Sequence, residues 1–189
     1  MGKYQIIYAD PPWKYNDRSC SGACEKHYNT MKIEDICNLP VRELADDNCV
    51  LFLWTTYPML NEAMELIKAW GFKYKTIGFQ WIKLNKSCNN LLFIQKNNFF
   101  FGLGRWTRGN TEPCLIGIKG KPKRINNSVS QLIMEPIGKH SKKPDIVRKK
   151  IVELVGDLPR VELFARNKTD GWDVWGNEVK SDIEFGVKQ

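Results

Sequence analysis

Short hydrophobic runs alternate along this chain with stretches of helical apolar spacing, a pattern that predicts strands separated by helices. Residues 58–70 and 144–155 are the clearest helices, because each has a proline in its first turn and a glycine just past its end. Residues 32–37 and 41–45 are predicted as shorter helices. Strands are predicted at residues 4–9, 49–55, 74–84, 111–119 and 160–165, with a short extended piece at 131–136 and a further candidate at 172–179.

Strands that alternate with helices are typical of an α/β fold with a mainly parallel sheet. At 189 residues, of which 42% are hydrophobic, the chain can bury the core of one domain, predicted to span residues 1–189. Ligands bind such folds beyond the carboxyl ends of the strands. Asp10, Thr55 and Arg166 each come at the end of a predicted strand, so we expect them at one rim of the sheet.

Two polar segments, at residues 14–30 and 85–110, are predicted as long loops. The second is rich in Asn, Lys and Gly, and loops of this length are usually functional or mobile. Its aromatic residues at 99–101 and 106 could stack on bases, while Arg105 and Arg108 could contact phosphates. We therefore predict a substrate-binding loop at about 85–110. The alternative is a partly ordered hydrophobic hairpin.

The formal net charge of +8 favours nucleic acid as a partner, although an ordinary protein with a basic surface has the same balance. The apolar runs are too short to cross a bilayer and the first residues lack the layout of a signal peptide. We therefore expect a cytoplasmic protein with reduced cysteines and no membrane partner. Cys20, Cys24, His27 and Cys37 have an irregular spacing for a zinc site, and no metal is expected.

The candidate chemistry lies in Asp10-Pro11-Pro12-Trp13, which directly follows the first predicted strand. Two prolines remove two backbone donors and fix the direction of the chain, so nearby carbonyls are expected to stay free as acceptors. An adenine amine is a poor nucleophile because its lone pair is shared with the ring. Asp10 and the Pro11 carbonyl could accept its two hydrogens, and Trp13 could stack on an unstacked base. The alternative is a plain strand-ending turn whose tryptophan packs in the core.

A series of further segments accompanies this turn. They are Ala9-Asp10-Pro11-Pro12-Trp13, His27-Tyr28-Asn29-Thr30-Met31, Leu51-Phe52-Leu53-Trp54-Thr55, Trp70-Gly71-Phe72, Trp81-Ile82-Lys83, Thr111-Glu112-Pro113-Cys114-Leu115-Ile116-Gly117, Ser141-Lys142-Lys143-Pro144-Asp145, Glu162-Leu163-Phe164-Ala165-Arg166 and Trp172-Asp173-Val174-Trp175-Gly176-Asn177-Glu178. In this order, and over roughly residues 4–180, the chain resembles the adenine-N6 methyltransferases of the mRNA adenosine methylase type, as a bacterial or phage-like member.

The resemblance implies a Rossmann-like methyltransferase sheet, circularly permuted so that the catalytic turn comes first, with S-adenosyl-L-methionine as cofactor. It implies that residues 10–13 are catalytic and that Asp10 also lies near the methionine amino group of the cofactor. Lys143 would face the cofactor's carboxylate or a target phosphate; a solvated charge at a helix start is the alternative. The residues implied at or beside the cofactor's ribose are Arg166, Asn167, Asn177 and Glu178.

Several of these assignments have competing interpretations. Arg166 could instead form a structural ion pair with Glu162. His27 and Tyr28 could position the substrate, or His27 could be an ordinary surface histidine. No Gly-x-Gly motif follows the last strand, where Ala165-Arg166-Asn167-Lys168 stands, so no glycine loop is expected. Because nine residues precede Asp10 in this sequence, the seat of the cofactor's adenine is expected to differ from that of members with a longer preceding segment.

DNA is favoured over RNA as the substrate, because no appended RNA-binding module is apparent in the sequence. An RNA adenosine methylase and a non-catalytic nucleic-acid-binding subunit remain alternatives, and a homodimer or heterodimer is left open. Methylation of cytosine's amine would use the same geometry, but related enzymes of that kind favour serine where Asp10 stands. The intact acidic turn favours an enzyme over a scaffold.

Overall fold

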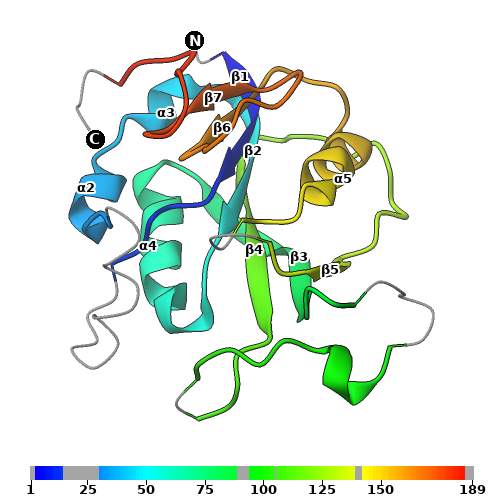
Figure 1. Cartoon of the computed structure of the whole chain (residues 1–189). Helices are drawn as coiled ribbons and strands as arrows, with labels where there is room; N and C mark the ends of the chain where they lie inside the picture. The colour runs from blue at the N-terminus through cyan, green and yellow to red at the C-terminus, as the bar shows by residue number, and fades with distance from the viewer. Residues whose placement is uncertain (1–2, 15–29, 89–93, 105, 139–141, 186–189) are drawn as a thin grey trace. The chain divides into compact units, whose positions relative to one another are not determined.

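The computed structural model describes residues 3–14, 30–88, 94–104, 106–138 and 142–185 (Figure 1). Its strands form a seven-stranded sheet in the order β5-β3-β4-β2-β1-β6-β7. Neighbouring strands are parallel where β1 meets β2 and β6, where β6 meets β7, and where β3 meets β5. This arrangement confirms the predicted α/β class and fits a Rossmann-like methyltransferase sheet; the circular permutation stays a prediction.

The chain divides into two compact units, made of residues 1–76, 115–122 and 158–189, and of residues 77–114 and 123–157. The prediction of one domain with a substrate loop stays a prediction. No helix in the described parts of the chain is both long enough and apolar enough to cross a membrane.

The first unit is built around the hydrophobic strand β1, whose parallel neighbours are β2 and β6, with β7 beyond β6. Every residue of β1 except Gln5 is buried, as expected of a strand covered on both faces. The bounds of these strands are β1 Tyr4–Ala9, β2 Ala45–Trp54, β6 Arg160–Leu163 and β7 Asp173–Trp175.

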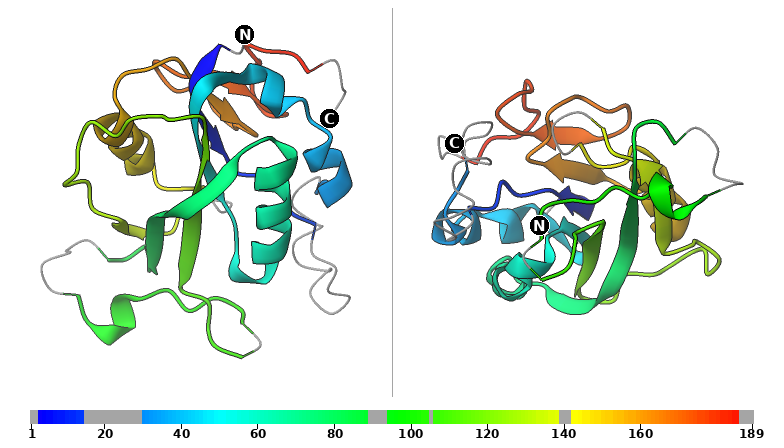
Figure 2. Two further views of the ribbon diagram at one scale, coloured as in Figure 1. Left: turned by 180° about the vertical axis from the view of Figure 1, so that it is seen from behind. Right: turned by 60° about the horizontal axis from the view of Figure 1, so that its bottom comes forward.

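The helices of the first unit are α2 Ile33–Cys37, α3 Val41–Leu44, the 3-10 turn η1 Tyr57–Met59 and α4 Leu60–Ala69. The apolar spacing of α4 turns Ala63, Leu66 and Ile67 inward, and all three are buried. The Trp70 indole, just past α4, donates a hydrogen bond of 3.0 Å to the carbonyl of Ile36 in α2. These two helices therefore lie side by side (Figure 2).

The second unit contains most of β3 Lys73–Leu84, the start of β4 Thr111–Lys119, β5 Leu132–Pro136 and α5 Ile146–Val155, with the 3-10 turn η3 Lys96–Asn98. The pairing of β3 with β5 sets Trp81 opposite Ile133, and both side chains are buried. The Trp81 indole donates to the carbonyl of Glu135 at 2.9 Å. The short piece predicted at 131–136 is therefore a strand of the sheet.

Several predicted ends differ from the observed ones. The second strand begins at Ala45 rather than residue 49, because Ala45 pairs with Tyr4 of β1. The polar residues 46–48, which have no hydrophobic pattern, lie where the register of this pairing shifts. The helices predicted from residues 58 and 144 begin at Leu60 and Ile146. Pro58 lies in the 3-10 turn η1, and the Pro144 carbonyl accepts the tighter, three-residue hydrogen bond from the Val147 N–H. The last two strands end early, at Leu163 and Trp175, where the chain turns.

Candidate active site

Four parallel strands of the first unit end side by side. The register sets Ala9 of β1 beside Leu53 of β2 and Leu163 of β6, and sets Leu163 beside Trp175 of β7. The residues that follow these positions therefore leave the sheet at one rim, where ligands bind in folds of this kind. Asp10 follows Ala9 directly, so this rim is the candidate site.

Arg166 and Thr55, the other residues expected at this rim, differ in character. Arg166 lies three residues beyond the end of β6 and its side chain is 32% exposed. Thr55 follows β2 but is only 1% exposed, and its hydroxyl lies 3.3 Å from the carbonyl oxygens of Thr56 and Met59. Thr55 is therefore part of the frame of the rim.

The turn after β1 is held by backbone hydrogen bonds. The Trp13 N–H donates to the Pro11 carbonyl and the Met31 N–H donates to the Pro12 carbonyl, both at 2.9 Å. The expectation that these carbonyls stay free is therefore wrong, because the chain folds back on them. A carbonyl oxygen has two lone pairs, so each can accept one further hydrogen bond. Asp10 is half-buried, which leaves part of its side chain accessible at the rim.

Trp13 packs in the core. Its side chain is 7% exposed, and its indole donates to the carbonyl of Trp54 at 3.2 Å. The Trp54 indole in turn donates to the Tyr8 hydroxyl at 2.7 Å. In this arrangement Trp13 fixes the turn, as the alternative interpretation predicted, and does not present a free face for stacking a base.

The segments after β6 and β7 lie against each other. Phe164 adopts a left-handed backbone with a φ of 61°, which turns the chain so that the Ala165 N–H donates to the Trp175 carbonyl at 2.9 Å. A Cβ atom on Gly176 would lie 2.0 Å from the Ala165 carbonyl oxygen, so only glycine permits this approach.

This close approach brings together the residues predicted to bind the cofactor's ribose. Arg166 Nε lies 3.7 Å from an Oε of Glu178, while Asn167 and Asn177 are exposed beside them. Asn and Glu side chains can together donate to and accept from vicinal hydroxyl groups, so the donor set fits a ribose. Glu178 is an ion-pair partner of Arg166 that sequence reasoning did not predict.

The second unit contains a buried ionic cluster centred on Glu112. This side chain is 7% exposed; one carboxylate oxygen lies 2.6 Å from Lys83 Nζ and the other 3.1 Å from Lys143 Nζ. Lys143 itself is 9% exposed, which excludes the interpretation of a solvated charge at a helix start. The Lys83 ammonium also lies 5.0 Å from the centre of the Trp81 ring, a cation–π contact.

The electrostatics of this cluster are set by two opposing effects. Burial alone would raise the pKa of Glu112, but the positive charges of Lys143 and Lys83 outweigh it, and the pKa lies below its ordinary value. Glu112 is therefore an anion that fixes both lysines. Sequence reasoning did not single it out, although a lone carboxylate within an apolar predicted strand was the signal that could have revealed a buried ion pair.

The predicted substrate loop is ordered at its base and open at its tip. The Phe100 N–H donates to the Lys83 carbonyl and the Gly102 N–H to the Gly109 carbonyl, both at 2.9 Å. Beyond this base Leu103 is 90% exposed and Trp106 fully exposed. Arg108 is exposed too, and the sequence from 85 to 111 has no acidic residue.

Other candidate residues lie outside the described part of the chain, namely His27, Tyr28, Arg105, Cys20 and Cys24. Among the residues that are described, no group of His, Cys, Asp and Glu side chains has the geometry of a metal site.

The sequence matches the MT-A70 family over residues 4–178. It is 37% identical to the Type II methyltransferase M.MunI of a Mycoplasma species, over 94% of this chain and 78% of that protein. It is 29% identical to an N(6)-adenosine-methyltransferase MT-A70-like protein of Arabidopsis thaliana, over 95% of this chain and 24% of that one. It is 28% identical to the N(6)-adenosine-methyltransferase catalytic subunit METTL3 of Homo sapiens, over 95% of this chain and 29% of that one.

The chain therefore spans most of the bacterial relative but only about a quarter of the eukaryotic ones. The match covers the acidic turn, the segments that form the rim and the buried cluster around Glu112. With this fold and this extent of similarity, the chain belongs to the MT-A70 family of adenine methyltransferases.

Proposed function

We propose that this protein transfers a methyl group from S-adenosyl-L-methionine to the exocyclic amine of adenine in nucleic acid, with DNA favoured over RNA. The observation that supports the reaction most is the half-buried Asp10 in a hydrogen-bonded turn at the end of the central strand β1. DNA is favoured because the similarity to a Type II methyltransferase covers most of that protein, whereas the adenosine methyltransferases match over about a quarter of their length.

The chemistry required of the turn is the activation of a weak nucleophile. The Asp10 carboxylate and the second lone pair of the Pro11 carbonyl would accept the two hydrogens of the adenine amine. These two hydrogen bonds would draw the amine nitrogen toward a tetrahedral geometry and localise its lone pair. When bound, the cofactor supplies a methyl group on a positively charged sulfur. Fixed acceptors suit this step because they need no rearrangement as charge develops.

Trp13 is proposed to brace this turn. Its hydrogen bond to Trp54 and that of Trp54 to Tyr8 connect the turn to β2 and β1. A base that leaves its stack would therefore have to be held by other side chains. The exposed Leu103 and Trp106 of the loop, with Arg108 for phosphates, are the proposed substrate contacts. His27, Tyr28 and Arg105 also stay proposed substrate residues.

The cofactor is proposed to use the residues at the ends of β6 and β7. Asn177 and Glu178 would contact the ribose hydroxyls, with Arg166 and Asn167 beside them. Asp10 would also lie near the methionine amino group. Lys143, held at 3.1 Å from Glu112, is proposed to receive an anion, either the cofactor's carboxylate or a phosphate of the nucleic acid.

The test is methyl transfer from labelled cofactor to duplex DNA, single-stranded DNA and RNA of matched sequence. Asp10→Ala should lower transfer about a hundredfold or more at saturating cofactor, where a weakened contact to the methionine amino group no longer limits the rate. Asp35→Asn, at an exposed position of α2, should leave the rate unchanged. A protein that binds cofactor and nucleic acid but transfers no methyl group would instead be a non-catalytic subunit. Transfer to RNA alone would favour an RNA adenosine methylase.

A further inference from the structure

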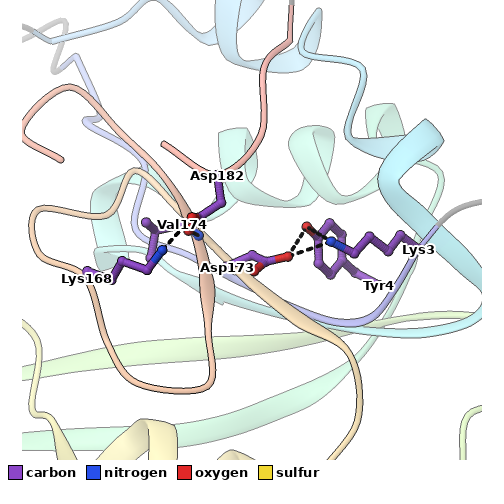
Figure 3. Close-up of polar contacts among 6 residues, drawn as sticks. All are labelled: Lys3, Tyr4, Lys168, Asp173, Val174 and Asp182. Atoms are coloured by element: carbon purple, nitrogen blue, oxygen red, sulfur yellow. Dashed lines mark hydrogen bonds and ion pairs between the residues drawn. The ribbon is translucent and has the colours of Figure 1, made fainter. Parts of the chain in front are cut away.

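One carboxylate, that of Asp182, connects the two segments that hold the proposed ribose ligands (Figure 3). Its side chain accepts a hydrogen bond of 3.0 Å from the Val174 N–H and forms an ion pair with the Lys168 ammonium. Its own N–H donates to the Val174 carbonyl at 2.8 Å. Asp182 is therefore joined to β7 through both backbone groups of Val174, and to the segment after β6 through Lys168.

Each end of this connection lies next to a proposed ribose ligand. Lys168 comes two residues after Arg166. Asp182 closes the turn that begins at Gly176 and contains Asn177 and Glu178. Within that turn the Gly176 N–H donates to the Ser181 hydroxyl at 3.2 Å.

We propose that Asp182 and Lys168 are positioning residues that hold the two ribose-binding segments in place for the cofactor. This inference rests on the proposed function of those segments. The physical reason is pre-organisation: a loop whose ends are fixed before binding loses less conformational entropy when the ligand arrives. Without the ion pair, the two segments keep the Arg166–Glu178 pair and the hydrogen bond from the Ala165 N–H to the Trp175 carbonyl, but they lose one side-chain connection. More of their ordering then has to come from ligand binding.

Asp173, in the strand β7 that Asp182 contacts, provides a matched control. Its carboxylate accepts hydrogen bonds from the Tyr4 hydroxyl at 2.5 Å and from Lys3 Nζ at 2.7 Å. Figure 3 shows the two carboxylates as separate groups along β7, Asp182 with Lys168 and Asp173 with Lys3 and Tyr4. Asp173 opens β7, at the end opposite to Asn177, so its contacts secure the strand but not the ribose-binding segments.

The experiment measures cofactor affinity by calorimetry for the full chain and its Asp182→Ala, Asp182→Asn, Lys168→Met and Asp173→Asn variants. S-adenosylmethionine and 5′-methylthioadenosine, which lacks the amino-acid part, are the two ligands. Asp182→Ala, which also loses the hydrogen bond from the Val174 N–H, should weaken both ligands about tenfold. Lys168→Met removes only the exposed ion pair and should weaken both ligands by about threefold. Asp173→Asn should leave both affinities within about twofold while lowering the melting temperature.

Hydrogen exchange of the ligand-free protein gives a readout independent of binding. The Val174 amide should exchange faster in Asp182→Ala than in the wild type. In the affinity measurements, the double variant Asp182→Asn with Lys168→Met should weaken cofactor binding by less than the product of the two single effects. If exchange accelerates but both affinities stay unchanged, the inference is wrong while the proposed function stands. If the wild-type protein binds neither ligand, the proposed function itself fails. Should Asp182→Ala not fold, Lys168→Met alone decides, since an unchanged affinity there overturns the inference.

Discussion

Replacing Glu112 by Gln removes the negative charge that holds two lysines in the second unit. The carboxylate lies 2.6 Å from Lys83 and 3.1 Å from Lys143. At an effective dielectric constant of about 20, unit charges at these distances attract by about 6 and about 5 kcal/mol. Much of this attraction is offset by the desolvation of the three charged groups. Glu112→Gln nevertheless removes the carboxylate charge that both ammonium groups contact.

The expected cost follows from measurements on buried pairs that lost one partner. Such changes destabilise proteins by about 3–5 kcal/mol. Because the Gln oxygen can still accept a hydrogen bond from one lysine, we expect the lower end, about 3 kcal/mol. For a chain of this size that corresponds to a fall in melting temperature of roughly 6–12 °C. The loss should be measured by urea and by thermal unfolding at pH 7.

Asp145→Asn is the matched control, because Asp145 also bridges two cations but in water. Its oxygens lie 2.5 Å from Lys142 Nζ and 2.9 Å from an Arg148 nitrogen, and its side chain is 66% exposed. Exposed ion pairs of this kind contribute at most about 1 kcal/mol. If Glu112→Gln costs no more than Asp145→Asn, the argument that burial makes the Glu112 cluster important is refuted.

The pH dependence gives the argument a second test. The pKa of Glu112 is lowered on folding from its ordinary value of 4.5. The carboxylate therefore contributes stability above that value and loses the contribution as the pH falls through the lower, folded-state pKa. The stability gap between the wild type and Glu112→Gln should be complete at pH 7 and should narrow below pH 4.5. A gap that is independent of pH would contradict an electrostatic origin.

Three further predictions follow from local geometry. Gly176→Ala should destabilise the protein by about 2 kcal/mol or more and weaken cofactor binding, because the new Cβ would lie 2.0 Å from the Ala165 carbonyl oxygen. Gly109→Ala is the control: its Cβ meets nothing within 4 Å, so urea unfolding should show no change in stability. Trp106→Ala should leave stability unchanged, since the side chain is fully exposed, but should weaken DNA binding by about 1–3 kcal/mol. A titration followed by fluorescence anisotropy measures the affinity, and unchanged binding would remove Trp106 from the proposed contacts. Burial raises the pKa of the Cys49 thiol to about 12, so iodoacetamide at pH 8 should leave Cys49 unmodified in the folded protein and modify it after unfolding. Mass spectrometry measures the modification, and rapid labelling of the folded protein would contradict the burial of Cys49.

The elements of this fold that hydrophobic spacing defines could be predicted from the sequence. The strand at 4–9 and the strand at 111–119 have the predicted bounds, because each is a mainly apolar run, interrupted only by Gln5 in the first and by Glu112 near the start of the second. The start of β2 could not be predicted, since Asp46, Asp47 and Asn48 are polar and the strand reaches back to Ala45 through a register shift in its pairing with β1. Local pattern defines an element, whereas pairing with a distant strand defines where it ends.

The site was predictable in its position more than in its side-chain contacts. That Asp10 and Arg166 lie at one rim follows from their positions just after predicted strands and from the rule for parallel sheets. The burial of Trp13 did not follow, because the same residue type suits a stacking surface and a core, and the hydrogen bond to Trp54 depends on tertiary packing. Asp182 gave no signal in the sequence, since it lies in a polar stretch beyond the last predicted strand.

The burial of Trp13 changes how the acidic turn is understood. Its hydrogen bond to Trp54 and that of Trp54 to Tyr8 connect the turn to the two central strands, and the Pro12 carbonyl is bound by Met31. A turn secured on so many sides can hold the Asp10 carboxylate and the Pro11 carbonyl at a fixed separation. That rigidity is what an acceptor pair needs if it is to act on an amine without reorganising. In the proposed mechanism, the tryptophan of the turn would therefore serve the chemistry by fixing the geometry of its neighbours.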